Sequence, residues 1–166
     1  MKENPMNKIK IEKVVLSIGA TGEDLEKAVK LLGLITEKKP MKTKSRKRIP
    51  SLGVRPGLEI GAMVTIRKNP QEILKRLLES IENSLNKKQV ADNHLSFGIR
   101  EYIEIPGIEY QRDIGIIGLD VTIVFVKPGK KVKLKKIKKG KFSKRQYASK
   151  QEIIKYMEDN FQTEFT

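Results

Sequence analysis

The chain has 166 residues and no cysteine, so disulfide bonds and thiolate metal sites are excluded. Its 35 Lys and Arg residues stand against 20 Asp and Glu residues, and the formal net charge is +15. One histidine, His94, is too few for a zinc site, and no apolar run approaches the roughly 20 residues that span a bilayer. We therefore expect a cytoplasmic protein with no metal, no other cofactor and no membrane contact.

The positive charge is concentrated in two segments of the chain. Residues 38–48 include seven basic residues and residues 127–150 include twelve, and neither segment contains an acidic residue. The rest of the chain is slightly acidic. Such a distribution is typical of a protein that binds a polyanion. The alternative is a lysine-rich solvated surface, which growth at high temperature also favours, but such a surface would mix both signs of charge.

The beginning of the chain predicts a strand followed by a helix. Residues 8–18 alternate in hydrophobicity, and the phase changes at Glu12-Lys13, which indicates a β-bulge or a twist. Thr21 and Asp24 stand at capping-box spacing, with Asp in place of the usual Glu or Gln. A helical apolar stripe follows and ends before Pro40. The stripe consists of Leu25, Ala28, Val29, Leu32 and Ile35.

A short strand, a long loop and a longer strand come next. Residues 41–44 predict the short strand, and residues 45–57, which contain Pro and Gly repeatedly, predict a loop without a helix. Residues 58–67 then alternate between an apolar face and a mixed face. A strand of this kind is typical of a sheet that is covered on one side only.

The middle of the chain predicts a second helix and two more strands. Asn69 is a candidate N-cap, and Pro70 suits the first helical position. Residues 97–105 and 116–126 predict the two strands, which a turn-rich segment joins. The apolar stripe of the helix consists of Ile73, Leu74, Leu77, Leu78, Ile81 and Leu85.

The C-terminal part predicts a basic extension. Residues 130–144 predict an edge strand that continues into an irregular basic arm. Ser149 and Glu152 predict a capping box for a final helix, whose apolar stripe should dock on the protein body or on a neighbouring protein. That stripe consists of Ile153, Ile154, Met157 and Phe161. We expect an RNA-binding domain at 1–129 and a basic C-terminal extension with a terminal helix at 130–166.

The order of the elements predicts an α+β fold. We expect a mostly antiparallel sheet with helices packed on one face and an open face for RNA. Catalytic chemistry is poorly supported, because no P-loop spacing occurs and His94 has no nucleophile partner. Asp113 and Asp120 flank a glycine-rich stretch, where roles in turns and on strand faces are favoured over acid–base work. We expect no catalytic residue.

Features of RNA binding are better supported. Pro50 and Gly53 limit the freedom of the long loop and so lower the cost of ordering it on RNA, although a mobile surface loop is the alternative. The mixed strand face with Thr65 and Arg67 offers a shallow polar surface that suits RNA. Aromatic residues are 5% of the chain, which gives little support for a base-stacking platform. The loop residues expected to contact RNA are Lys44, Arg46, Lys47, Arg48 and Arg55.

The basic arm should repel itself in the free protein, remain largely disordered there, and become ordered against the phosphates of a bound RNA. The arm residues expected to bind RNA are Lys131, Lys133, Lys135, Lys136, Lys138, Lys139, Lys141 and Arg145.

An ordered set of short motifs resembles the large-subunit ribosomal protein five family, in its archaeal form. The set begins at Asn4-Pro5-Met6 and extends to about Pro128. Any one motif is weakly specific, but the ordered set is highly specific. The further motifs are residues 11–19 (IEKVVLSIG), 44–55 (KSRKRIPSLGVR), 60–67 (IGAMVTIR), 96–99 (SFGI), 105–108 (IPGI) and 115–121 (GIIGLDV).

The resemblance implies a structural protein whose open sheet face holds 5S ribosomal RNA, with Asn4, Thr65 and Arg67 at positions that the family uses for it. It further implies contacts with large-subunit ribosomal RNA in the central protuberance. The long loop would reach toward peptidyl-site transfer RNA. The protein partners implied are another 5S-binding protein and a protein of the small-subunit head.

This chain departs from bacterial members at Glu37-Lys38 and at Leu52, so an exact copy of the bacterial contacts is not implied. Two alternatives to a ribosomal RNA binder remain. A free RNA chaperone or translation factor could use the same basic segments. An RNA-modifying enzyme would need a nucleophile, metal ligands or a cofactor loop.

Overall fold

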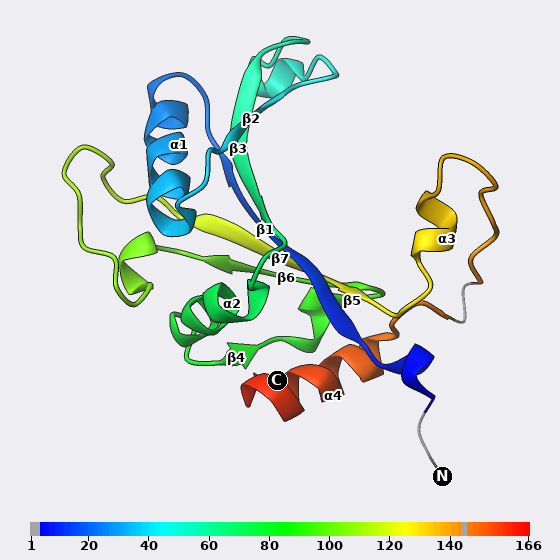
Figure 1. Ribbon diagram of the computed structural model, residues 1–166. Coiled ribbons are helices and arrows are strands. Elements are labelled where there is room, and N and C mark those ends of the chain that lie inside the picture. The colour runs from blue at the N-terminus through cyan, green and yellow to red at the C-terminus, as the bar shows by residue number, and fades with distance from the viewer. Residues whose placement is uncertain (1–3, 144–145) are drawn as a thin grey trace.

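A six-stranded antiparallel sheet forms the centre of the fold (Figure 1). The computed structural model describes residues 4–143 and 146–166. The strand order is β2-β3-β1-β7-β6-β5, and every neighbouring pair is antiparallel. The strands are β1 (Lys10–Gly19), β2 (Met41–Lys44), β3 (Glu59–Ile66), β5 (Val90–Ala91), β6 (His94–Ile99) and β7 (Leu119–Val126).

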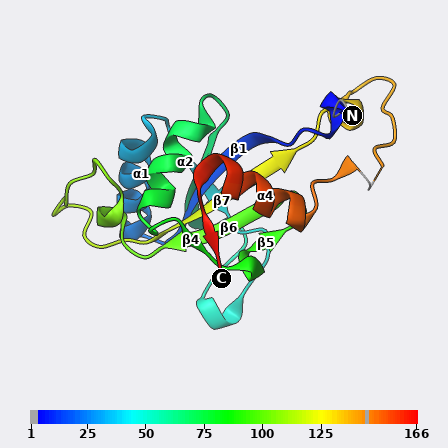
Figure 2. The same ribbon diagram turned by 90° about the horizontal axis from the view of Figure 1, so that it is seen from below.

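Three helices cover one face of this sheet, as the two perpendicular views show (Figures 1 and 2). They are α1 (Glu23–Thr36), α2 (Pro70–Glu79) and α4 (Lys150–Phe161). A fourth, short helix, α3 (Lys131–Leu134), lies away from the sheet in the basic segment. Short 3-10 turns occur at η1 (Pro5–Asn7), η2 (Pro50–Leu52), η3 (Lys87–Gln89) and η4 (Tyr102–Glu104), and a parallel pair joins β4 (Ser84–Leu85) to β8 (Glu164–Phe165). The expected α+β class is confirmed.

The core lies between the sheet and the three helices. Alternate strand positions point into it, which is why Val14, Leu16 and Ile18 of β1 are almost fully buried while Val15 and Ser17 are not. The expected bulge is also present, because the pairing of β1 with β7 shifts between Ile11 and Lys13. The other strands contribute Ala62, Val64, Ile66, Leu95, Phe97, Ile99, Leu119, Val121, Ile123 and Phe125 to the core.

The side-chain caps expected for the first two helices are wrong. The chain enters α1 through Gly22, whose φ of 63° places it in a region that favours glycine, and no side chain caps the helix. Asn69 before α2 is also left-handed and makes no cap hydrogen bond, although Pro70 does occupy the first turn as expected. An N-cap normally has extended backbone, from which its side-chain oxygen reaches the first turn.

Three expected elements end elsewhere or have another form. β6 ends at Ile99 because the fully buried Tyr102 draws the chain into a 3-10 turn, where the Tyr102 N–H donates to Ile117 O at 3.2 Å. Leu85, expected on the second helical stripe, lies in β4 instead. No strand occurs at residues 130–143, where the structure has α3 and irregular chain, so the expected edge strand is wrong there.

The final helix is as expected. Ser149 and Glu152 form the predicted capping box, and Ile153, Met157 and Phe161 pack into the core, which confirms docking on the protein body. The division of the chain after residue 129 stays a prediction. In the part of the chain that the structure describes, no helix is both long and apolar enough to cross a membrane.

Candidate nucleic-acid interface

The uncovered face of the sheet carries polar side chains around Val15. The register of β1 sets Val15 opposite Thr65 of β3 on one side and Thr122 of β7 on the other, so these three side chains share this face. The hydroxyl of Thr122 lies 3.2 Å from that of Ser96 on β6. Both hydroxyls remain partly exposed. Hydroxyl groups can both donate and accept hydrogen bonds, which suits the sugar hydroxyls and phosphates of RNA.

Two of the three residues expected at a 5S site lie on this face. Thr65 is half-buried in β3, and Arg67 follows two residues later in the same alternation, exposed just beyond the strand. Asn4 lies before β1, where its Oδ1 accepts the N–H of Met6 at 3.0 Å and caps η1. Because β1 and β3 are antiparallel, the start of β1 and the end of β3 lie at the same end of the sheet.

Several other side chains on this face were not predicted to contact RNA. They occupy alternate positions on strands whose opposite face is buried, so the period of two is the signal that could have found them. Lys13 adds a positive charge near Arg67, whereas Asp120 adds a negative one farther along. The residues concerned are Lys13, Ser17, His94, Ser96, Asp120 and Thr122.

The long loop between β2 and β3 is a closed hairpin. At its base the Ser45 N–H donates to Leu58 O, and the Gly57 N–H donates to Ser45 O, each at 2.8 Å. Near its tip Ile49 and Val54 exchange both backbone hydrogen bonds, at 2.9 and 3.1 Å. These bonds pre-organise the loop, which lowers the entropy cost of binding. The expectation of a loop without a helix is wrong at the tip, which contains the 3-10 turn η2.

All five basic residues expected in the loop are exposed. Lys44 lies 4.0 Å from Glu59 Oε1, so its charge is partly balanced. The other four have no acidic partner within the ranges 4–143 and 146–166; they are Arg46, Lys47, Arg48 and Arg55.

The basic arm, defined as residues 130–143, extends from the end of β7 (Figure 1). Residues 131–139 are all exposed, as is Lys141, so the expected lysines present their ammonium groups to solvent. Lys130 is the exception, since it forms an ion pair with Glu12 of β1. Arg145, also expected to bind RNA, lies outside the described residues.

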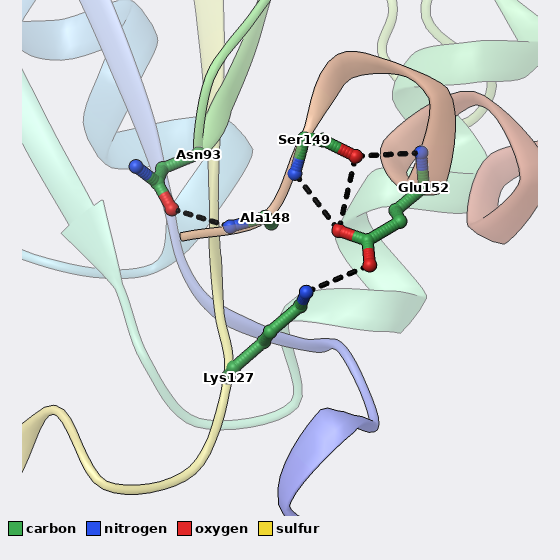
Figure 3. Close-up of polar contacts among 5 residues, drawn as sticks. All are labelled: Asn93, Lys127, Ala148, Ser149 and Glu152. Atoms are coloured by element: carbon green, nitrogen blue, oxygen red, sulfur yellow. Dashed lines mark hydrogen bonds and ion pairs between the residues drawn. The ribbon is translucent and has the colours of Figure 1, made fainter. Parts of the chain in front are cut away.

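The chain beyond the arm is anchored at the start of α4 (Figure 3). Lys127, only 7% exposed, donates to Glu152 Oε1 at 2.7 Å, while the other carboxylate oxygen accepts the Ser149 N–H at 2.9 Å. Asn93 binds Ala148 twice: its Oδ1 accepts the Ala148 N–H at 2.9 Å, and its own N–H donates to Ala148 O at 3.0 Å. The chain is therefore held to the sheet before the arm, through β7, and again after it, at residues 148–152.

In the described part of the chain, no three His, Asp or Glu side chains are placed to hold a metal ion. The arrangement is instead a polar sheet face flanked by two basic projections. It suits a large polyanion.

Family comparison agrees with this geometry. Residues 4–55 match the family described as ribosomal protein L5, and residues 59–156 match the ribosomal L5P family C-terminus. This chain belongs to the ribosomal protein L5 family. The resemblance found in the sequence motifs is thus confirmed, including its archaeal type.

The relatives cover nearly the whole chain. The large ribosomal subunit protein uL5 of Nanoarchaeum equitans is 42% identical and covers 95% of both chains. That of Sulfolobus acidocaldarius is 41% identical, covering 96% of this chain and 92% of its own. That of Methanobrevibacter smithii is 38% identical over 98% of both chains. The ribosomal protein L5 matches therefore include the arm and α4, and not only the sheet.

Proposed function

We propose that this chain, a structural and non-catalytic constituent of the large ribosomal subunit in the cytoplasm, binds 5S ribosomal RNA through the open face of its sheet. The observation that carries the proposal is the uncovered polar face between two basic projections. Asn4, Thr65 and Arg67 are the proposed 5S contacts. An arginine at the rim of a shallow face can hold a phosphate with two parallel hydrogen bonds.

The two projections serve different RNAs in this proposal. The hairpin loop, with Lys44, Arg46, Lys47, Arg48 and Arg55, reaches toward peptidyl-site transfer RNA. The seven exposed lysines of the arm, together with Arg145 beyond it, bind large-subunit ribosomal RNA in the central protuberance. Another 5S-binding protein and a protein of the small-subunit head are the proposed protein neighbours.

A substitution at Arg67 tests the 5S site. In the intact chain, Arg67→Ala should weaken binding of 5S RNA about 10-fold or more, because a charge-assisted hydrogen bond contributes roughly 1.5–3 kcal/mol. Arg67→Lys should restore part of the affinity, since it keeps the charge without the two-pronged geometry. Lys30→Ala, an exposed position on α1, is the matched control and should leave the affinity unchanged.

Binding equal to that of the parent in a folded Arg67→Ala variant would remove Arg67 from the site.

A separate assay distinguishes a ribosomal protein from a free RNA chaperone. The chain should sediment with large subunits through a moderate-salt wash, whereas a free factor would be released.

A further inference from the structure

A pocket of about 250 Å³ opens beside the basic arm. Its walls come from four parts of the chain: Asn93 between β5 and β6, the end of β7, helix α3 with the preceding Lys130, and the segments on either side of residues 144–145. Phe142 and Tyr147 give it aromatic surface, and Lys133 lies on its wall. Phe125, which is almost fully buried, also lines it. Pockets for drug-sized ligands typically have volumes of roughly 300–1,000 Å³, so this one suits a single ring system.

We propose that this pocket binds one unpaired base of ribosomal RNA, stacked on Phe142 and Tyr147, with the adjoining phosphate held by Lys133. The inference rests on the proposed role of the arm in binding ribosomal RNA and adds a base-recognition site to it. The low aromatic content of the sequence, 5% of the chain, by itself gives base stacking little support.

The aromatic geometry favours a stacked base. The rings of Phe142 and Tyr147 have centroids 5.6 Å apart and planes inclined by 34°, so they form one tilted apolar wall rather than a closed stack. Aromatic side chains near the surface of RNA-binding proteins stack unpaired bases irrespective of sequence, because every base has a π face. The carboxamide of Gln146 also lines the pocket and can pair with a base edge.

The charge distribution selects a nucleotide over an apolar peptide side chain. Two lysines of the pocket already have carboxylate partners, since Lys127 binds Glu152 and Lys130 binds Glu12. The ammonium group of Lys133 lies 3.5 Å from the Tyr147 hydroxyl, at the aromatic wall, and has no carboxylate within salt-bridge distance among the described residues. A base brings a phosphate that this ammonium group can bind, whereas an apolar side chain brings none.

Two RNA hairpins that differ at one position test the pocket. Both have the same stem; one carries a single bulged adenine and the other an abasic residue at that position. The intact parent protein should bind the adenine bulge about 10-fold more tightly, because stacking of one base on an aromatic side chain contributes about 1–3 kcal/mol. Phe142→Leu should abolish this preference, and Tyr110→Leu, which alters an exposed aromatic residue outside the pocket, should retain it.

A fluorescent variant gives an independent measurement. The chain contains no tryptophan, so Phe142→Trp introduces a single tryptophan into the pocket. The adenine bulge should quench its fluorescence, and the abasic hairpin should not. Equal, salt-sensitive binding of both hairpins by the parent, without selective quenching, would overturn the base pocket while leaving charge-driven RNA binding intact. Failure of the parent to bind either hairpin would instead contradict RNA binding by the arm.

Discussion

Glu152 connects the last helix to the sheet through one side chain. Burial alone would raise the pKa of its carboxyl group, but hydrogen bonds from Lys127 and Ser149, together with the Lys127 charge, outweigh that effect and lower the pKa. A carboxyl group whose pKa is lower in the folded state than in the unfolded state stabilises the fold above its unfolded pKa. That contribution disappears as the pH falls through the lowered value.

This relation predicts an acid-sensitive anchor for α4. The free energy of unfolding of the parent should decrease as the pH falls from about 5 through the region of the unfolded Glu pKa, which is about 4.3. Glu152→Gln should reduce that dependence and lower stability at neutral pH, because Lys127 is then left without its partner while nearly buried. Urea unfolding between about pH 3 and 7 measures both effects. Glu158→Gln, on the exposed part of the same helix, is the control and should keep the parental pH dependence. If the free energy of unfolding varied with pH in the same way in all three proteins, the role of Glu152 would be contradicted.

Two glycines make a matched pair for a second residue-scale prediction. A Cβ at Gly61 in β3 would lie 2.7 Å from the backbone oxygen of Ile18, so the neighbouring strand would have to move. A Cβ at Gly33 in α1 would meet nothing within 4 Å. Gly61→Ala should therefore destabilise the fold by about 1–3 kcal/mol, whereas Gly33→Ala should stabilise it by about 0.5–1 kcal/mol. If the urea midpoints of both variants moved in the same direction, the close approach of β3 to the Ile18 backbone would be contradicted.

At the scale of elements, periodicity predicted most of the fold. Alternation identified the main parts of β1 and β3, since each strand buries one face and a period of two is then imposed on its side chains. The strand predicted at 116–126 contains all of β7, whereas the one predicted at 97–105 overlaps β6 only at residues 97–99. The apolar stripes of α1, α2 and α4 were found because each helix also buries one face, which imposes the helical period on its side chains. The phase change at Glu12-Lys13 even located the bulge, because an extra residue reverses which side chains point inward.

Elements set by contacts distant in sequence were not predictable in this way. Nothing near Tyr102 indicates that its ring is buried and that its hydroxyl accepts the Gln111 N–H, which ends β6 early. Among the candidate RNA-binding residues, too, those marked by a local pattern were predicted and those assembled by distant contacts were not. Charge runs identified the loop and the arm, and alternation identified the face of Thr65. The aromatic pocket was missed because Phe142 and Tyr147 meet the end of β7 only in three dimensions.

The hairpin loop should be separable from the rest of the protein. Deletion of residues 46–54 leaves in place the hydrogen bonds of Ser45 with Gly57 and Leu58, which close the base of the loop. The variant should therefore fold and bind 5S RNA within about 3-fold of the parent, because exposed loops tolerate such changes. Chemical footprints of peptidyl-site transfer RNA on assembled ribosomes should change. Loss of 5S binding in a folded deletion variant would show that the loop and the sheet face are not separate sites.

Over the whole molecule, charge is divided between the helical layer and the projections. The first turn of α1 contains Glu23, Asp24 and Glu26, and the groove between the ends of α2 and α4 includes Glu79 and Asp159. The loop and the arm are basic instead. A polyanion is therefore attracted to the side of the projections rather than to the helices, where acidic and basic residues are mixed, and this orients the protein before binding.

This division predicts steep and local salt dependence of RNA binding. Each bound phosphate contributes roughly −0.7 to −0.9 to the slope of log affinity against log salt, so about six bound phosphates would weaken binding on the order of 1,000-fold between 50 and 200 mM salt. Substituting Gln at Lys135, Lys136 and Lys138 of the arm should make the slope for large-subunit ribosomal RNA shallower by roughly one for each lysine–phosphate pair that is removed.

The same substitution at Lys30, Lys75 and Lys155, which are exposed on the three helices of the other layer, removes as much charge. It should leave the slope nearly unchanged, because those lysines do not face the RNA. Equal slopes for the two triple variants would mean that only net charge matters, and a parental slope near zero would contradict phosphate binding altogether.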